Sequence, residues 1–434
     1  MRVVSRIRPP FDRGAFGVEC SVDVSERITA RYDGVKTFLV GAARQGLEVA
    51  LRAAGLGSDD VVALADFNCS SVLAPLRHLG LRPALFDVRR DFSIDVKQLD
   101  AVVSQSSARA VVLTHYFGAS CWTDELIAWA ETMRQHGVLI IEDAAHSLCD
   151  DVQPDIGRHG DVVLLSFGND KPLSVGKGGA VLIRDEKILS AFEKEWRRLP
   201  ARDKAEERRL IAWHIFHSLL SSPARCVMGV PCVPPAGCAP SPMEFDKLIA
   251  AVVHEASGRD ILSLPYARKI VGGWRAQNSL WGRVARRLGL FKGSGAQTST
   301  GLGKDVSIPV RMGEVSRRLL ASYWQAGIID WANKVRCRNY ARMTGSCGRG
   351  SRLRYTPVYD CAEQATAVLA RARKVGIEAG CFNWGSLLST SLGLKRELPS
   401  WAVRPEWVVN YPVHPYMTDE ELDLVARVAG KDLD

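Results

Sequence analysis

Continuous apolar runs alternate with helical patterns between residues 46 and 184 of the chain. The apolar runs are short and contain few polar positions, which is typical of strands buried on both faces. The stretches between them repeat apolar residues every three or four positions, as amphipathic helices do. We therefore expect a largely parallel sheet covered by helices on both faces. The predicted strands lie at 60–64, 82–88, 110–115, 138–141 and 162–165, and the predicted helices at 46–54, 71–79 and 123–135.

The pattern changes after Arg184. Residues 189–304 contain few strand signals, and Pro and Gly interrupt the helical stretches there. Regular patterns return later, as helical or strand-like runs at 315–341, 353–359, 363–375 and 418–428. These changes predict three parts: a large α/β domain at 1–188, a mostly helical or loop insertion at 189–305, and a small α+β domain at 306–434.

The composition is that of an ordinary globular protein, with 47% hydrophobic and 24% charged residues in a chain of 434. No apolar run reaches the roughly 18 residues that suggest a membrane span, and the N-terminus lacks the apolar stretch of a secretory signal. The 11 cysteines contain no CxxC pair, so we expect reduced thiols and a cytoplasmic protein. Cys226, Cys232 and Cys238 recur every six residues, but this is not a zinc-ligand spacing, and we expect no metal site.

The net charge of +9 arises from lysines and arginines that are spread along the chain. They are not gathered in one stripe with aromatic residues, so no nucleic-acid partner is expected. Residues 281–292 have an apolar side and a basic side. Such a segment can dock on an anionic membrane surface, but more often its apolar side packs on the protein. The positive charge also suits small anionic substrates.

Two motifs place chemical groups at the ends of predicted strands. Asp143 follows the run at 138–141, and Lys171 lies in the loop after the run at 162–165. In α/β proteins, ligands bind and catalytic side chains gather at the carboxyl ends of strands. An amine and a carboxylate on neighbouring strand ends are what a pyridoxal phosphate (PLP) enzyme needs. The lysine forms a Schiff base, and the acid keeps the pyridine nitrogen protonated.

Further motifs accompany these two in a fixed order. They are Gly46-Leu47-Glu48-Val49-Ala50-Leu51, His115-Tyr116-Phe117-Gly118, Glu142-Asp143-Ala144-Ala145-His146, Ser166-Phe167 with Lys171 and Gly176-Lys177-Gly178-Gly179, Val375-Gly376-Ile377-Glu378-Ala379-Gly380, and Tyr411-Pro412-Val413-His414-Pro415-Tyr416. The series resembles the PLP-dependent sugar-nucleotide aminotransferases of the DegT/DnrJ/StrS type, over residues 35–185 and 306–430. The resemblance implies a fold-type I, aspartate aminotransferase-like α/β fold and a homodimer whose active sites lie between two subunits.

The resemblance also implies roles for individual residues. Lys171 would be the Schiff-base lysine and proton shuttle, and Asp143 would pair with the pyridinium nitrogen. His146 stands where the family usually has glutamine and would donate a hydrogen bond to the phenolic oxygen of the cofactor. The phosphate would be bound by the hydroxyl of Ser166 and by the backbone amides of Arg44 and Gln45 at a helix start.

Three departures from the family pattern affect these expectations. Cys69 occupies the position that usually carries an aromatic residue over the pyridine ring, so either its sulfur or Phe67 packs on the ring. Lys177 stands at a usually acidic position and adds positive charge that suits an anionic substrate. The sequence motifs that the family carries after the lysine motif, in a region that helps bind substrate, are missing from 189–304. The residues of the substrate pocket are therefore not defined by the sequence.

Three functions are compatible with these features. The leading hypothesis is an aminotransferase that moves an amino group from an amino acid, such as L-glutamate, to a keto sugar nucleotide, for a surface polysaccharide or a secondary metabolite. A second is another PLP reaction, such as dehydration or aromatization of a cyclic keto substrate, suggested by Cys69 and His146. A third is a binding protein that keeps the cofactor fold without turnover, suggested by the divergent 189–304 stretch.

Overall fold

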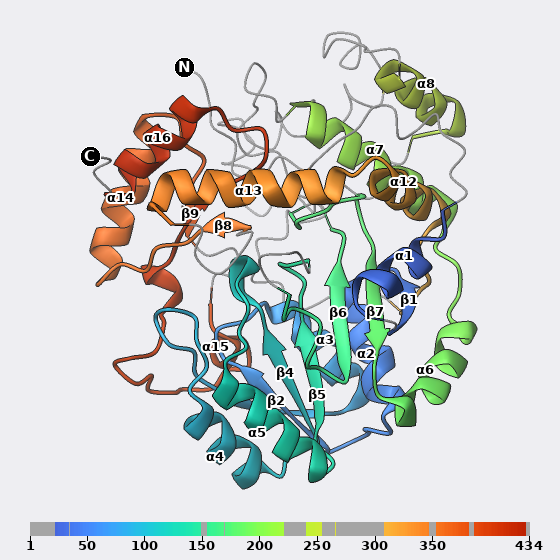
Figure 1. Ribbon diagram of the computed structural model, residues 1–434, viewed down its shortest axis with the longest axis vertical. Coiled ribbons are helices and arrows are strands. Elements are labelled where there is room, and N and C mark those ends of the chain that lie inside the picture. The colour runs from blue at the N-terminus through green and yellow to red at the C-terminus, as the bar shows by residue number, and fades with distance from the viewer. Residues whose placement is uncertain are drawn as a thin grey trace, which may run out of the picture.

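The computed structural model describes residues 22–33, 35–148, 154–168, 170–220, 240–253, 265, 308–346, 353–381 and 386–430. They form a large α/β unit with a smaller α+β unit beside it (Figure 1). Within them, no helix combines the length and apolar character needed to cross a bilayer. No group of three or more His, Cys, Asp or Glu side chains in this part of the chain is arranged to hold a metal ion.

The large unit is built on a seven-stranded sheet, in the order β1-β7-β6-β5-β4-β2-β3. Its strands are β1 (Lys36–Val40), β2 (Val61–Ala65), β3 (Arg82–Phe86), β4 (Ala110–Thr114), β5 (Leu139–Asp143), β6 (Val162–Ser166) and β7 (Gly179–Ile183). The five predicted strands are β2 to β6, and all of them run parallel. β1 and β7, which the apolar runs did not predict, close one side of the sheet, with β7 antiparallel to both neighbours. The expectation of a mostly parallel α/β sheet is confirmed.

Helices cover both faces because alternate residues of each strand point to opposite sides. On one face, α2 (Ala43–Ala53), α3 (Leu73–Leu79) and α6 (Glu186–Arg198) pack on the side that includes Val62, Val112, Ile141 and Leu164. On the other face, α4 (Val96–Ser106) and α5 (Asp124–Gln135) pack on the side that includes Ala63, Val111 and Ile140. α1 (Val24–Arg31) completes that second face beside β6 and β7. Figure 1 shows α4 and α5 in front of the strands.

The large unit continues past residue 188. The ring of Phe192, on α6, lies 4.9 Å from that of Phe38, and Trp196 Nε1 donates to the Leu39 carbonyl at 2.9 Å. The described part of the predicted insertion is helical, as α6, α7 (Lys204–Leu220) and α8 (Pro242–Val253). The segment 281–292 and the three cysteines at 226, 232 and 238 lie outside the described residues.

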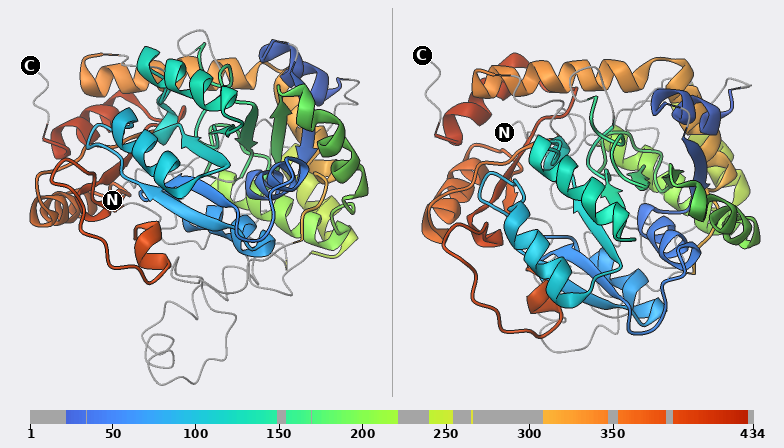
Figure 2. Two further views of the ribbon diagram at one scale, coloured as in Figure 1. Left: turned by 90° about the horizontal axis from the view of Figure 1, so that it is seen from below. Right: turned by 60° about the horizontal axis from the view of Figure 1, so that its bottom comes forward.

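The run predicted as one helix at 315–341 forms two helices, α12 (Glu314–Gln325) and α13 (Ile328–Thr344). Gly327 separates them with a positive φ of 66°, a conformation that glycine adopts at little cost. α13 runs along one edge of the molecule from α12 to the small unit (Figure 2). The small unit contains a sheet in the order β8-β10-β9. Its elements are β8 (Arg354–Tyr355), α14 (Ala362–Lys374), β9 (Gly380–Cys381), α15 (Leu388–Ser391), β10 (Val409–Pro412) and α16 (Asp419–Val428).

Candidate active site

A cavity of about 220 Å³ lies at the carboxyl ends of the central parallel strands. Thr114 lines it from the end of β4, Asp143 from the end of β5 and Ser166 from the end of β6. The start of α2 and the loop between β6 and β7 form further walls. Six of the seven predicted site residues line this one cavity: Arg44, Cys69, Asp143, His146, Ser166 and Lys171. The fold thus brings Asp143 and Lys171 to the same space.

Asp143 is the last residue of β5, and the alternation of the strand turns its side chain toward the cavity. Its Oδ1 accepts a hydrogen bond of 3.0 Å from the Ala145 amide. Burial raises the pKa of Asp143, while the Ala145 amide and the positive charge of Lys171 oppose this rise. A cationic ring nitrogen beside the carboxylate would favour its charged form further.

Glu142 precedes Asp143 and points away from the cavity into the protein interior. Its Oε2 accepts from His115 Nε2 at 2.9 Å, from Trp122 Nε1 at 3.1 Å and from the amide of Gly157 at 2.7 Å. Its Oε1 accepts from the amides of residues 159 and 160. Burial opposes ionisation of Glu142, but these donors, led by His115, lower its pKa overall. This carboxylate fixes the end of β5 from behind.

Lys171 lies in the loop between β6 and β7, and 17% of its side chain is exposed. Its Nζ lies 3.8 Å from Asp170 Oδ1. Burial alone would raise the pKa of Asp170, but the charges of Lys171 and Arg354 outweigh it and lower that pKa. A hydrogen bond of 2.9 Å from the Phe167 amide to the Gly178 carbonyl closes the loop. The lysine is therefore held at the cavity wall beside a charged carboxylate.

His146 lines the cavity as a neutral imidazole. Burial, aided by the charge of Lys171, lowers the pKa of His146 well below its usual value. Its Nδ1 accepts from the Phe117 amide at 3.4 Å, and its ring stacks on that of Phe117 at 5.8 Å. In a neutral ring whose Nδ1 accepts, Nε2 carries the proton. His146 can therefore donate a hydrogen bond, as the predicted role requires.

Ser166 and the start of α2 form the part of the cavity that suits a phosphate. α2 begins at Ala43, after Ala42, whose side chain makes no capping hydrogen bond. The first amides of a helix lack partners within the helix and favour anions. Gly179 permits this arrangement, because a Cβ at that position would lie 2.6 Å from the Ala43 nitrogen.

Gln45 is the predicted site residue that does not line the cavity. Its amide donates to the Ala42 carbonyl at 3.0 Å, and its side chain donates to the Ile308 carbonyl at 3.1 Å. In the structure, the residues of the helix start that line the cavity are Ala42, Ala43 and Arg44.

Cys69 lines the cavity, whereas Phe67 lies in the core against Tyr116 and Phe92, with ring centres 5.6 and 5.8 Å away. Of the two side chains considered for ring stacking, Cys69 is therefore the one at the cavity. Sequence reasoning did not select Asn68 and Thr114, which also line it and share a hydrogen bond of 3.1 Å. Their positions at or just after strand ends are the signal that identifies them.

The cavity residues fit PLP as a set. With PLP bound, Asp143 would pair with the ring nitrogen, Lys171 would bond the aldehyde and neutral His146 would donate to the phenolic oxygen. Ser166 and the start of α2 match the phosphate, and Lys177 adds a positive charge at the wall. Strand ends carry Asp143 and Ser166, whereas Lys171 and Lys177 lie in the loop between β6 and β7.

Residues 21–207 match the model of the DegT/DnrJ/EryC1/StrS aminotransferase family. The spore coat polysaccharide biosynthesis protein SpsC of Bacillus subtilis is 33% identical over 188 residues, which cover 43% of this chain and 47% of that protein. GDP-perosamine synthase of Caulobacter vibrioides is 28% identical over 168 residues, or 38% of this chain and 44% of that protein. The matched region thus spans slightly less than half the length of these relatives.

Solved structures extend the likeness of fold beyond residues 21–207. Spr1654 from Streptococcus pneumoniae, assigned as a sugar aminotransferase and solved in its PLP form, has a TM-score of 0.59 at 14% identity. The superposition covers 98% of this chain and 97% of that one. This confirms the fold-type I architecture expected from the motifs. Residues 21–207, the region that matches the DegT/DnrJ/EryC1/StrS aminotransferase family model, contain every residue that lines the cavity.

Proposed function

We propose that this protein is a PLP-dependent aminotransferase that moves an amino group from an amino acid to a keto sugar nucleotide. L-Glutamate is the expected donor, and the product would enter a surface polysaccharide or a secondary metabolite. The observation that carries the proposal is the presence of Lys171 and Asp143 on the walls of one cavity, at the carboxyl ends of parallel strands.

Bound PLP would supply a carbon that joins to amines and a ring that accepts electrons. The residues of this chain provide the rest. The amine of Lys171 would hold the cofactor and, once released, would hold and move a proton between the amino acid carbon and the cofactor carbon. The carboxylate of Asp143 favours a protonated ring nitrogen. His146 donates from Nε2, and Ser166 with the start of α2 binds the phosphate.

Two observations support a sugar nucleotide as the acceptor. GDP-perosamine synthase, by its name, makes a nucleotide-linked sugar. Arg44 and Lys177 both line the cavity, and positive charge at an opening favours the approach of a diphosphate. A homodimer remains part of the proposal, and light scattering of the purified protein measures it.

The assignment of Lys171 is tested by its replacement with alanine. The wild-type protein, mixed with PLP, is expected to develop the visible absorbance band of a lysine-bound cofactor, and Lys171→Ala is expected to lack it. Lys187→Ala, at the exposed start of α6, is the control and keeps the band. An identical band in the Lys171→Ala protein refutes the proposal.

The second candidate is another PLP reaction on the same scaffold, and Cys69 favours it. Because a thiol lies where an aromatic ring is expected, the contact above the ring differs from the family pattern. L-Glutamate separates the two candidates. Conversion of bound PLP to pyridoxamine phosphate with release of 2-oxoglutarate supports the aminotransferase, whereas an unchanged cofactor favours the alternative.

A further inference from the structure

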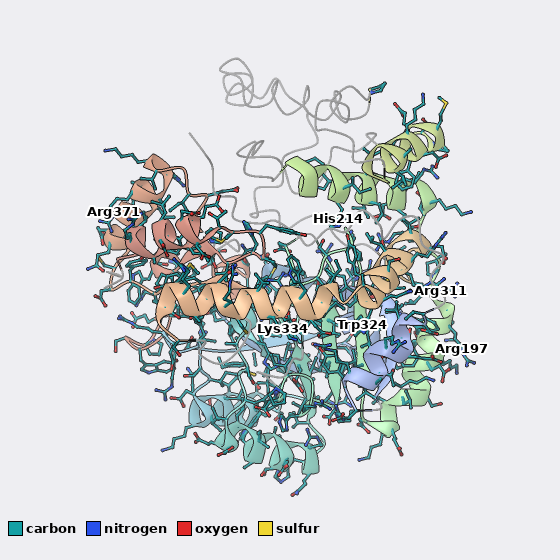
Figure 3. All side chains as sticks on the ribbon, turned by 45° about the horizontal axis from the view of Figure 1, so that its top comes forward. Arg197, His214, Arg311, Trp324, Lys334 and Arg371 are labelled. Atoms are coloured by element: carbon teal, nitrogen blue, oxygen red, sulfur yellow. The ribbon has the colours of Figure 1, made fainter. Side chains whose placement is uncertain are left out.

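The loop that carries Lys171 packs directly on helix α7. His214 on α7 is fully buried, and its Nδ1 lies 3.2 Å from the hydroxyl of Ser174, which is also fully buried. Figure 3 shows His214 on the side of α7 that faces the rest of the molecule. Gly176 adopts a positive φ of 86°, and a Cβ there would lie 3.1 Å from the Leu210 carbonyl oxygen and 3.3 Å from the His214 Cβ. Backbone and helix are therefore in close contact.

An ion pair extends the contact to the next part of the loop. Glu206, near the start of α7, lies 3.8 Å from Lys177 Nζ and accepts a hydrogen bond of 3.0 Å from Arg202. Its neighbour Glu207 accepts from the Ser316 amide at 3.0 Å and so joins α7 to α12. The helix that supports the loop is itself fixed to the body of the protein.

A second helix holds the loop from the side of Lys171. Arg336 on α13 is 3% exposed and donates from Nη2 to the carbonyl of Pro172, the residue after Lys171. The loop is thus attached at Pro172 to α13 and at Ser174 to α7. His214 and Arg336 both lie beyond residues 21–207, the region that matches the family model.

We propose that His214 is a positioning residue for Lys171, and that α7 supports the catalytic loop through the hydrogen bond between His214 and Ser174. This inference rests on the proposed role of Lys171. Lys171 is three residues from Ser174 in a short loop. Because the hydrogen bond to His214 holds Ser174 in place, its free energy limits how often Lys171 leaves the cavity wall. Loss of one neutral buried hydrogen bond corresponds to roughly a fivefold change in such an equilibrium.

The test measures the amine of Lys171 in the cofactor-free full-length protein. The protein is labelled briefly with acetic anhydride at several pH values, and mass spectrometry gives the rate for the peptide containing Lys171. His214→Ala is expected to raise this rate roughly fivefold. His214→Asn, which retains a polar group near the position of Nδ1, is expected to restore the wild-type rate.

Controls separate positioning from general loss of structure. Lys187, outside the loop, is expected to label at the same rate in all variants, and His136→Ala, an exposed histidine after α5, is expected to behave as wild type. Ser174→Ala is expected to raise the labelling rate of Lys171 as much as His214→Ala does. The double variant is expected to show no further increase in that rate. A wild-type labelling rate for Lys171 in His214→Ala overturns the proposal. An increase in the labelling rates of both Lys171 and Lys187 also overturns it.

The labelling does not require PLP, so its result is independent of the function proposed above. If wild type fails to bind PLP while His214→Ala still releases Lys171, the positioning contact stands and the proposed function fails. If wild type binds PLP but His214→Ala leaves Lys171 labelling unchanged, the positioning role of His214 is refuted and the proposed function is not.

Discussion

Glu142 and Asp143 are adjacent carboxylates with different environments. Glu142 faces the interior and accepts from two side chains and three amides, which keep it charged. Asp143 faces the cavity, where one amide bonds its Oδ1 and burial raises its pKa. The sequence predicted the position of Asp143 at the site, because a strand end is a recognisable position. It did not predict the partners of Glu142, which come from segments brought together only by the fold.

His146 provides a test at the scale of one residue. Because its pKa is lower in the folded protein than in the unfolded chain, the unfolded chain binds more protons as the pH falls below about 6.5. The stability that neutral His146 retains above this pH is therefore lost on acidification. In His146→Gln this loss is absent, so the wild type should lose stability faster, by up to about 1.4 kcal/mol per pH unit.

Urea unfolding of the cofactor-free proteins between about pH 7.5 and about pH 5 measures this difference. His136→Gln, at an exposed position, is expected to follow the wild type. Parallel stability curves for wild type and His146→Gln contradict the prediction.

At the scale of elements, local patterns predicted β2 to β6, because each is a continuous apolar run. β1 and β7 were missed because they pair with each other across more than a hundred residues of intervening chain, and β7 begins within the lysine motif. The break between α12 and α13 was also missed. A glycine inside a helical pattern is often tolerated, so Gly327 alone did not indicate a boundary.

Gly179 tests the contact between β7 and the start of α2. Gly179→Ala would bring a Cβ to 2.6 Å from the Ala43 nitrogen and 2.9 Å from the Leu165 carbonyl oxygen, so backbone must move. Overpacking of this kind costs about 1–3 kcal/mol, and a displaced helix start weakens phosphate binding as well.

Urea unfolding and PLP titration should both show the effect of Gly179→Ala. Gly57→Ala is the matched control, since a Cβ at Gly57 meets no atom within 4 Å. If Gly179→Ala retains wild-type stability and PLP affinity, this contact does not set the position of α2.

At the scale of the molecule, the apolar runs predicted the large parallel sheet and the motifs predicted most of the candidate site residues that line the cavity, while the contacts between distant parts of the chain required the structure. Arg396, after α15, lies 2.9 Å from Asp66 and 3.3 Å from Asp87, two buried carboxylates that follow β2 and β3. Asp66 also accepts from the Ser389 amide at 2.7 Å. These contacts attach the late segment around α15 to the strand ends, beside the loop that carries Cys69.

Arg396→Met should therefore be strongly destabilising, because it leaves two neighbouring buried carboxylates without their cation. Removal of one partner from a buried ion pair costs about 3 kcal/mol or more, which urea unfolding measures directly. Lys395→Met, which changes the adjacent exposed residue, should change the stability little. Equal stability of the two variants would mean that the pair of carboxylates needs no cation.

The pairing of the central strands has a consequence for how this candidate site can vary. Thr114 and Asp143 are directly opposite each other on β4 and β5, and Ser166 ends the next strand. Neighbouring strands lie about 4.8 Å apart whatever side chains they carry. The sheet therefore fixes the spacing between the side chains at its strand ends. Substitutions at these three positions can exchange one reactive group for another while leaving the intervals between them unchanged.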